Sequence, residues 1–403
     1  MAHPEVRGTH RQAEVGIVAV LDASYGRLSE AAKMLLHSVS VLRGEFEAEV
    51  ALAVSGLEKP LGEVAADLRQ LARQSWLLED EVKGARVYDF QQVVLAYVQH
   101  KAGELTAVHQ RAIGYYQSRV KLRGEWETLD DVREYLEIFY HYCQLGAYEL
   151  AFYTLRDDAY SSDCLDRFLD LRGYNSTLVE LYSQLVENWP EIDRQNWKFG
   201  AALTSLGIAY DSLGQYPRSI EFHQQQLDIS REIGDRQGEA ISLGGLGIAY
   251  DSLGQFQRSI EFHQQQLDIS REIGDRRGEA ISLNNLGETY QHLENYQQAI
   301  QCYQKALAIK KDLGNPQSQA MSWANLGEAL SKIDRVDDAL GAYRNARELY
   351  QSMELQTDVE FCDNAIQALT AALPPSQPKR NLWQWLKQQV RRFWRVFRQL
   401  LRR

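Results

Sequence analysis

The side chains best suited to chemistry, cysteine and histidine, are scattered along this chain without a catalytic or metal-binding pattern. The four cysteines are Cys143, Cys164, Cys302 and Cys362, and they form no CxxC pair and no Cys/His cluster with metal spacing. The chain also contains no HExxH, GxSxG or GxGxxG sequence and no GxxxxGK[ST] loop that would cradle phosphates. The sequence therefore predicts reduced, mostly buried thiols, no catalytic, cofactor-binding or metal-binding residues, and no enzymatic activity.

One glycine-rich stretch and two histidines resemble site residues but fit the interior of a helical repeat. Gly244-Gly245-Leu246-Gly247 falls inside a predicted helix, so we assign these glycines to close helix packing. His223 and His263 occupy a core position of another predicted helix, which favours interior histidines over ligands.

An internal repeat determines the predicted architecture. Residues 206–243 and 246–283 are identical at 35 of 38 positions, and more diverged copies begin at 286 and 326. Within each copy, leucine, isoleucine and tyrosine recur every three or four residues, which indicates two amphipathic helices. Leu213-Gly214-Gln215-Tyr216 predicts a tight turn between them, and Gly234, Gly274 and Gly314 predict the end of each second helix.

These residues resemble the tetratricopeptide motif. Leu203-x-x-Leu206-Gly207-x-x-Tyr210 matches its first helix, although Ser219, His223 and Gln226 depart from the small, aromatic and small residues of its second. The 40-residue unit is similar to the longer-helix subtype of kinesin light chains and bacterial signalling proteins. The resemblance covers about 195–355 and implies an all-α fold, an α-solenoid of helix–turn–helix repeats in a right-handed superhelix.

The N-terminal region predicts a different, smaller domain. Its pattern indicates three helices, at 28–42, 46–54 and 61–74, and then a hairpin of two short strands, at 76–79 and 86–90. A further helix is expected to begin near Gln91. Residues 28–56 resemble the winged-helix module that follows the nucleotide-binding domain of STAND-type (NB-ARC) signalling NTPases, whose phosphate-binding loop is missing here. Because helix 61–74 carries balanced charges, a packing module is favoured over DNA reading.

We therefore divide the chain into six segments. Residues 135–155 and 169–185 also read as helical hairpins, which we interpret as degenerate repeats. The segments are an N-terminal extension 1–27, a winged-helix-like domain 28–125, degenerate repeats 126–195, a repeat array 196–373, a proline-rich linker 374–378 and a basic amphipathic helix 379–403.

The last segment has its own charge and pattern. Net charge is −11, yet residues 379–403 carry nine Lys/Arg and no acid, which leaves −20 on the rest. At 100° per residue, most of its apolar residues fall in one arc of about 120°. The pattern favours a helix lying on an anionic membrane; docking onto a partner or onto the acidic body, nucleic-acid binding and a solvated helix are the alternatives. The residues expected at this contact are Trp383, Trp385, Arg391, Arg392, Phe393, Trp394, Arg395, Phe397 and Arg398.

The family resemblance implies a peptide groove along the first helices. Its expected residues are Thr204, Ile208, Asp211, Gly244, Ile248, Asp251, Asn284, Asn285, Glu288, Gln291, His292, Asn325, Glu328 and Lys332. The basic positions of the family's carboxylate clamp are Ile241, Ile281 and Met321 here, so we do not expect chaperone C-terminal peptides as ligands. The acidic residues of the groove favour a basic or neutral peptide, with a merely solvated face as the alternative.

The sequence thus predicts a protein-binding scaffold. No secretory signal and no stretch of about 18 apolar residues is visible, so we expect a cytoplasmic protein that the tail can bring to the inner face of the membrane. The two alternatives are a soluble sensor subunit that complements a separate STAND-type NTPase, and a nucleic-acid-associated regulator that uses the winged helix and the basic tail.

Overall fold

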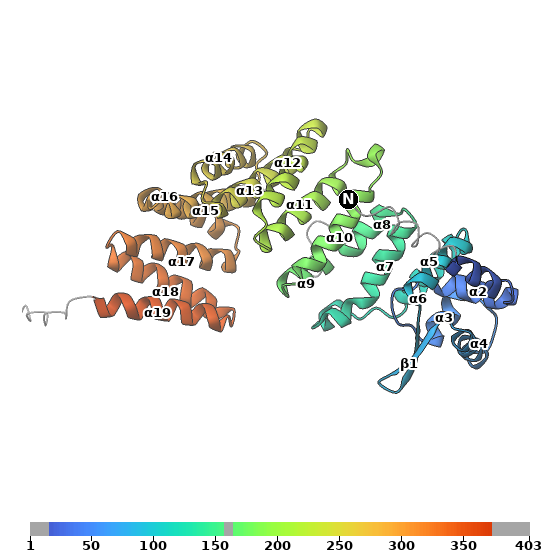
Figure 1. Ribbon diagram of the computed structural model, residues 1–403. Helices are drawn as coiled ribbons and strands as arrows, with labels where there is room; N and C mark the ends of the chain where they lie inside the picture. The colour runs from blue at the N-terminus through green and yellow to red at the C-terminus, as the bar shows by residue number, and fades with distance from the viewer. Residues whose placement is uncertain (1–15, 157–163, 373–403) are drawn as a thin grey trace, which may run out of the picture. The chain divides into compact units, whose positions relative to one another are not determined.

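The computed structural model describes residues 16–156 and 164–372, which fall into two compact units, Met1–Gln215 and Tyr216–Arg403. Within the described part, regular structure is helical except for one hairpin (Figure 1). The predicted tail residues from Trp383 to Arg398 lie outside the described residues. The boundary between the units falls inside the predicted array 196–373, and the six predicted segments remain a prediction.

The described part of the first unit begins with a helical segment at residues 16–25, and three helices and a hairpin follow in the predicted order. Leu36, Val54, Leu68 and Trp76 are buried in one shared core. Ser29 caps the first of these helices by accepting a hydrogen bond from the backbone N–H of Ala32. The elements are α2 (Glu30–Val39), α3 (Ala48–Ser55), α4 (Leu61–Arg73), β1 (Leu78–Val82), β2 (Ala85–Asp89) and α5 (Gln92–Ala102).

The predicted position of the first strand, 76–79, is wrong. Trp76 and Leu77 are buried in the core before the strand begins, and β1 continues to Val82, which pairs with Ala85. The connection is the two-residue turn Lys83-Gly84, in which both residues have positive φ (52° and 82°). Residues 80–82, which the predicted strands 76–79 and 86–90 leave in the connection between them, belong instead to the exposed strand β1.

The remainder of the first unit consists of short helices. The expected helical hairpins at 135–155 and 169–185 are present as α7–α8 and α9–α10, with Gly146 and Gly173 at positive φ in the turns. The elements are α6 (Thr106–Gln117), η1 (Arg123–Glu125), η2 (Leu129–Val132), α7 (Arg133–Gln144), α8 (Tyr148–Leu155), α9 (Leu165–Leu171), α10 (Asn175–Asn188), η3 (Glu191–Asp193) and α11 (Trp197–Ser212).

The second unit is a row of antiparallel helices in which each helix packs on the next. Its first helices recur every 40 residues, and Asp235 and Asp275 cap two of them by accepting from the N–H groups of Gly238 and Gly278. The helices are α12 (Tyr216–Ile233), α13 (Arg236–Ser252), α14 (Phe256–Glu272), α15 (Arg276–His292), α16 (Tyr296–Asp312), α17 (Pro316–Lys332), α18 (Val336–Ser352) and α19 (Gln356–Ala372). The predicted solenoid of helix–turn–helix units is confirmed.

Glycine allows each first helix to approach its partner closely. A Cβ placed on Gly247 would lie 2.4 Å from the His263 ring, and one on Gly287 would lie 2.6 Å from the Tyr303 ring. A Cβ placed on Gly245 would likewise lie 2.5 Å from the His223 ring. The interpretation of the glycine stretch as a packing device is thereby confirmed.

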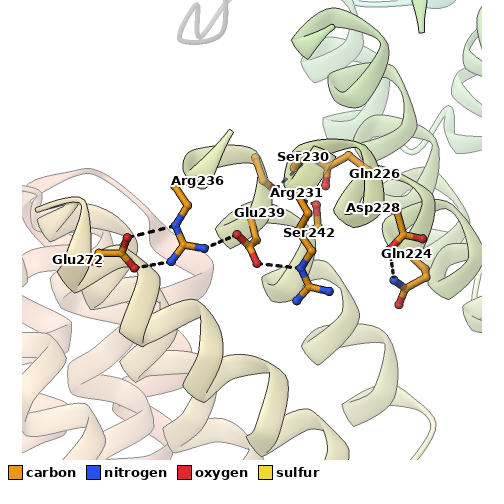
Figure 2. Close-up of polar contacts among 10 residues, drawn as sticks. Gln224, Gln226, Asp228, Ser230, Arg231, Arg236, Glu239, Ser242 and Glu272 are labelled. Atoms are coloured by element: carbon orange, nitrogen blue, oxygen red, sulfur yellow. Dashed lines mark hydrogen bonds and ion pairs between the residues drawn. The ribbon is translucent and has the colours of Figure 1, made fainter. Parts of the chain in front are cut away.

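Ion pairs link consecutive hairpins. Figure 2 shows Arg236 between Glu272 and Glu239, with Arg231 on the other side of Glu239. Burial alone would raise the pKa of Glu239, but its hydrogen bonds and proximity to both arginines outweigh burial, so that its pKa is lowered. The same arrangement recurs one repeat later around Glu279.

The turn inside each hairpin requires a left-handed residue. Gly254 supplies it with φ of 71°, whereas the equivalent positions of the two diverged copies are Glu294 and Asp334, with φ of 57° and 58°. Side-chain-bearing residues adopt this conformation at a cost of about 1 kcal/mol, because Cβ approaches the following carbonyl oxygen.

We predict that Glu294→Gly stabilises the second unit by about 0.5–1 kcal/mol, since the turn loses strain and no described contact of the Glu294 side chain is removed. Urea unfolding followed by circular dichroism measures this change. Glu261→Gly, placed within a helix, is the control and should destabilise by about 1 kcal/mol. A loss of stability in Glu294→Gly contradicts the strain argument.

Candidate peptide-binding groove

The first helix of each hairpin presents a single stripe to solvent. In α13, Ile241 and Ile248 are exposed and Gly245 between them is half-buried, whereas residues 242–244 and 246–247 are buried. Positions i, i+4 and i+7 share one face of a helix. The other faces are covered because α13 packs against both α12 and α14.

The stripe carries most of the residues expected in the groove. Its outer positions, exposed or half-buried, hold Ile248 on α13, Asn285, Glu288 and His292 on α15, and Asn325, Glu328 and Lys332 on α17. Neighbouring first helices contact one another, so these side chains form parallel rows across the unit.

Five of the expected residues meet at one hollow. It has a volume of about 630 Å³ and brings together Ile248, Asp251, Asn285, Glu288 and His292. Its wall is completed by residues that sequence reasoning did not assign to the groove: Tyr216, Ser252, Gly254, Phe256, His263 and Thr289. Tyr216 and Phe256 are the first residues of α12 and α14, so two successive second helices each begin with an aromatic side chain.

The polar groups of this hollow are incompletely paired. Asp251 Oδ2 lies 2.7 Å from Nδ1 of His292, whose ring centroid is 5.7 Å from that of Phe256. The other carboxylate oxygen of Asp251, Oδ1, is buried and has no hydrogen-bond partner among the described residues. Such a group is costly unless a ligand or water satisfies it.

Glu288 adds a second carboxylate. Desolvation is the main cause that raises its pKa; Asp251 and Glu328 raise it further, while His292 opposes them. Two carboxylates beside aromatic rings match an arginine or lysine side chain, which pairs with the acids and stacks on the rings. The amide of Asn285 can bond the backbone of the same peptide through both donor and acceptor.

Some expected residues lie elsewhere. Asn284 is buried, where its Oδ1 accepts from Lys310 Nζ at 3.2 Å and from Ser322 Oγ at 2.7 Å, so it joins hairpins instead of facing the stripe. Gly244 is likewise buried, against Gln266. Gln291 accepts from the Tyr303 hydroxyl at 3.3 Å.

Three further expected residues belong to the first unit. Thr204, Ile208 and Asp211 lie on α11, and the Thr204 hydroxyl donates to the carbonyl of Gly200 at 3.1 Å. Ile208 is 48% exposed, as its repeat equivalent Ile248 is at 46%.

A second hollow lies further along the same stripe. It has a volume of about 360 Å³ and joins Met321 and Asn325 to Phe361 of α19, with Gln317, Ala324, Tyr350 and Asp358 completing its wall. The sequence analysis placed Met321 at a clamp position of the groove, but it did not place Phe361 in a binding surface. The recurrence of a large apolar residue every 40 positions, at 241, 281, 321 and 361, was the available signal.

The described ranges contain neither a metal-binding cluster nor a membrane-spanning helix. Across residues 16–156 and 164–372, no group of three or more His, Cys, Asp or Glu side chains is arranged to hold a metal ion. No helix in that part of the chain is long and apolar enough to cross a membrane.

A family model described as a tetratricopeptide repeat matches residues 199–272 and 278–352. These segments are tetratricopeptide repeats, in agreement with the hairpins and the glycine contacts described above. No curated protein matches the chain.

Several solved structures are similar to it. A STAND signal transduction ATPase with a tetratricopeptide repeat sensor, from Pyrococcus horikoshii, is 17% identical over 89% of this chain and 56% of its own, with a TM-score of 0.48. This chain therefore spans just over half of that protein. BtubC (BKLC) from P. vanneervenii is 20% identical over 67% and 96% of the two chains, with a TM-score of 0.41. The apo form of RapI is 16% identical over 61% and 77%, with a TM-score of 0.42.

His263, in the wall of the larger hollow, couples stability to pH. It is 1% exposed, and burial lowers its pKa to about 4. The folded state therefore disfavours the protonated ring, so its stabilising contribution is complete above about pH 6.5 and is lost as the pH falls towards 4.

We predict that the second unit loses up to about 2 kcal/mol from this residue between pH 7 and pH 5. His263→Tyr, which copies the ring of Tyr303, should remove that part of the loss, because tyrosine stays neutral over this range. Urea unfolding at both pH values measures the difference. Equal pH dependence in the variant and the unaltered protein contradicts the assignment.

Proposed function

We propose that this chain is a non-catalytic scaffold that binds a basic segment of a partner protein along the stripe of α13, α15 and α17. The tetratricopeptide repeats support a role in protein interaction. The observation that carries the proposal is the hollow in which Asp251, with an unpaired buried oxygen, and Glu288 face the aromatic residues Tyr216 and Phe256.

The groove offers three kinds of contact to such a segment. Asp251 and Glu288 receive a cationic side chain, and their shared negative field also attracts the segment before docking. Asn285 and Asn325 bond its backbone, which gives affinity without demanding one side-chain sequence. Ile248 accepts an aliphatic side chain of the segment.

We predict that Glu288→Gln weakens binding of basic peptides about 5–10-fold, because one desolvated carboxylate no longer compensates the bound cation. The measurement is fluorescence anisotropy with synthetic peptides graded in net charge. Glu261→Gln, which removes an exposed carboxylate from the second helix α14, is the matched control and should change nothing. Affinity that ignores peptide charge, or equal loss in both variants, contradicts the proposal.

We further propose that residues 379–403 bring the scaffold to anionic membranes. The support is sequence alone: nine basic residues and no acid, alternating with tryptophan, phenylalanine and leucine. Each basic residue near such a surface contributes about 1 kcal/mol, so several together anchor a protein reversibly from the cytoplasm.

We predict that the full chain sediments with anionic vesicles and releases at high salt, because screening weakens the attraction between arginine and lipid phosphate. A chain ending at residue 373 should stay in solution. Neutral vesicles provide the control. Equal behaviour of the two chains contradicts membrane recruitment through the tail.

A second candidate function is a regulatory subunit for a separate STAND-type NTPase. The three helices and hairpin of residues 30–89 favour it, since this is the layout of a winged helix. If this chain is purified from the native cell with its bound partners and no ATPase is among them, the regulatory-subunit function is contradicted. A nucleic-acid-associated regulator is the third candidate, and α4 offers it no excess of basic residues.

A further inference from the structure

The first helices of the second unit expose a row of large apolar side chains that the proposed peptide contacts do not require. Ile241, Ile281, Met321 and Phe361 occupy the same position of four successive first helices and are 46%, 42%, 51% and 53% exposed. We call these four residues the apolar ladder. Aligned exposed apolar residues of this size indicate a surface that another chain segment covers.

Acidic side chains lie on the same helices, about two to three turns beyond the ladder. Glu288 stands seven residues after Ile281, and Glu328 seven residues after Met321, so each pair shares a face. Asp251 stands three residues after Ile248 on α13, and two basic residues accompany the acids on these faces, Arg277, four residues before Ile281, and Lys332, at the end of α17. The surface therefore pairs an apolar row with a mainly acidic row.

We propose that the chain's own residues 379–403 dock on this surface, with their apolar arc on the ladder and their arginines towards the acidic row. This inference rests on the proposed groove and adds its regulation. The last rung, Phe361, belongs to α19, which ends at Ala372, so the tail leaves the described fold beside the surface it would cover.

The dimensions are compatible. As a helix, 25 residues extend about 38 Å at 1.5 Å per residue. Helices in contact lie about 8–10 Å apart, so the three steps from Ile241 to Phe361 span about 30 Å. The predicted tail helix therefore covers the whole ladder, running back from α19 towards α13.

The charges are complementary as well. Residues 216–372 contain 14 Lys/Arg and 23 Asp/Glu, a net charge of −9, and residues 379–403 carry nine basic residues and no acid. A short tether keeps the tail at an effective concentration of about millimolar, so that even a modest intrinsic affinity occupies the groove. A partner segment must then displace the tail from the groove. A membrane that binds the tail would instead leave the groove empty.

The test uses the full chain and a labelled synthetic peptide with the sequence of residues 379–403, observed by fluorescence anisotropy. The variant Arg391→Gln/Arg395→Gln/Arg398→Gln weakens the attached tail without touching the described fold. We expect this variant to bind the peptide at least 10-fold more tightly than the unaltered chain, whose groove is already occupied. Adding Met321→Asp should abolish that gain, whereas Leu313→Asp, at a turn residue of similar exposure (46%), should preserve it.

Each other outcome overturns the inference. If the peptide binds both chains with equal affinity, the groove accepts basic helices but the tail does not occupy it, and the proposed function survives. If it binds neither chain, the groove and its regulation are both wrong. If affinity in the unaltered chain rises on dilution of the protein, the occupant is the tail of a second copy.

Discussion

The close approach of the two helices in each hairpin is the constraint on which the second unit depends. Gly247, Gly287 and Gly327 each face a ring of the second helix, and an added Cβ on any of them would come within 2.4–3.1 Å of that ring. Every hairpin therefore packs at nearly the same short distance, and the same contact recurs every 40 residues. Because α13, α15 and α17 are then enclosed by neighbours, only one stripe of each reaches solvent.

Polar groups fix how consecutive hairpins meet. Glu239 and Glu279 are buried, and each forms ion pairs with two arginines whose side chains remain exposed. The desolvation cost of these ion pairs therefore falls mainly on the glutamate. In the third copy, Lys310 takes a similar place beside Asn284 and Ser322, and burial lowers its pKa to about 8. A lysine without a carboxylate is a costly choice, which specifies this junction more than it stabilises it.

The repeats share one backbone arrangement, and the groove arises because their stripe residues differ from copy to copy. The row that carries Ile248 in one hairpin carries Glu288 and Glu328 in the next two, and the row of Gly245 carries Asn285 and Asn325. The shared backbone arrangement keeps these positions on one face while their chemistry changes from apolar to acidic. A segment lying across the first helices thus meets a graded surface, with the apolar ladder beside it.

The sequence by itself determined the hairpins, their turns and their order, because apolar spacing and glycine act within a few residues of the chain. It also identified the faces that carry Asn285, Glu288 and His292. Only the tertiary structure decided that Asn284 is buried while its neighbour Asn285 faces solvent, since successive residues point about 100° apart and the adjacent hairpin covers one direction. The same holds for the hollow, whose aromatic residues Tyr216 and Phe256 come from helices that meet Asp251 and Glu288 only after packing.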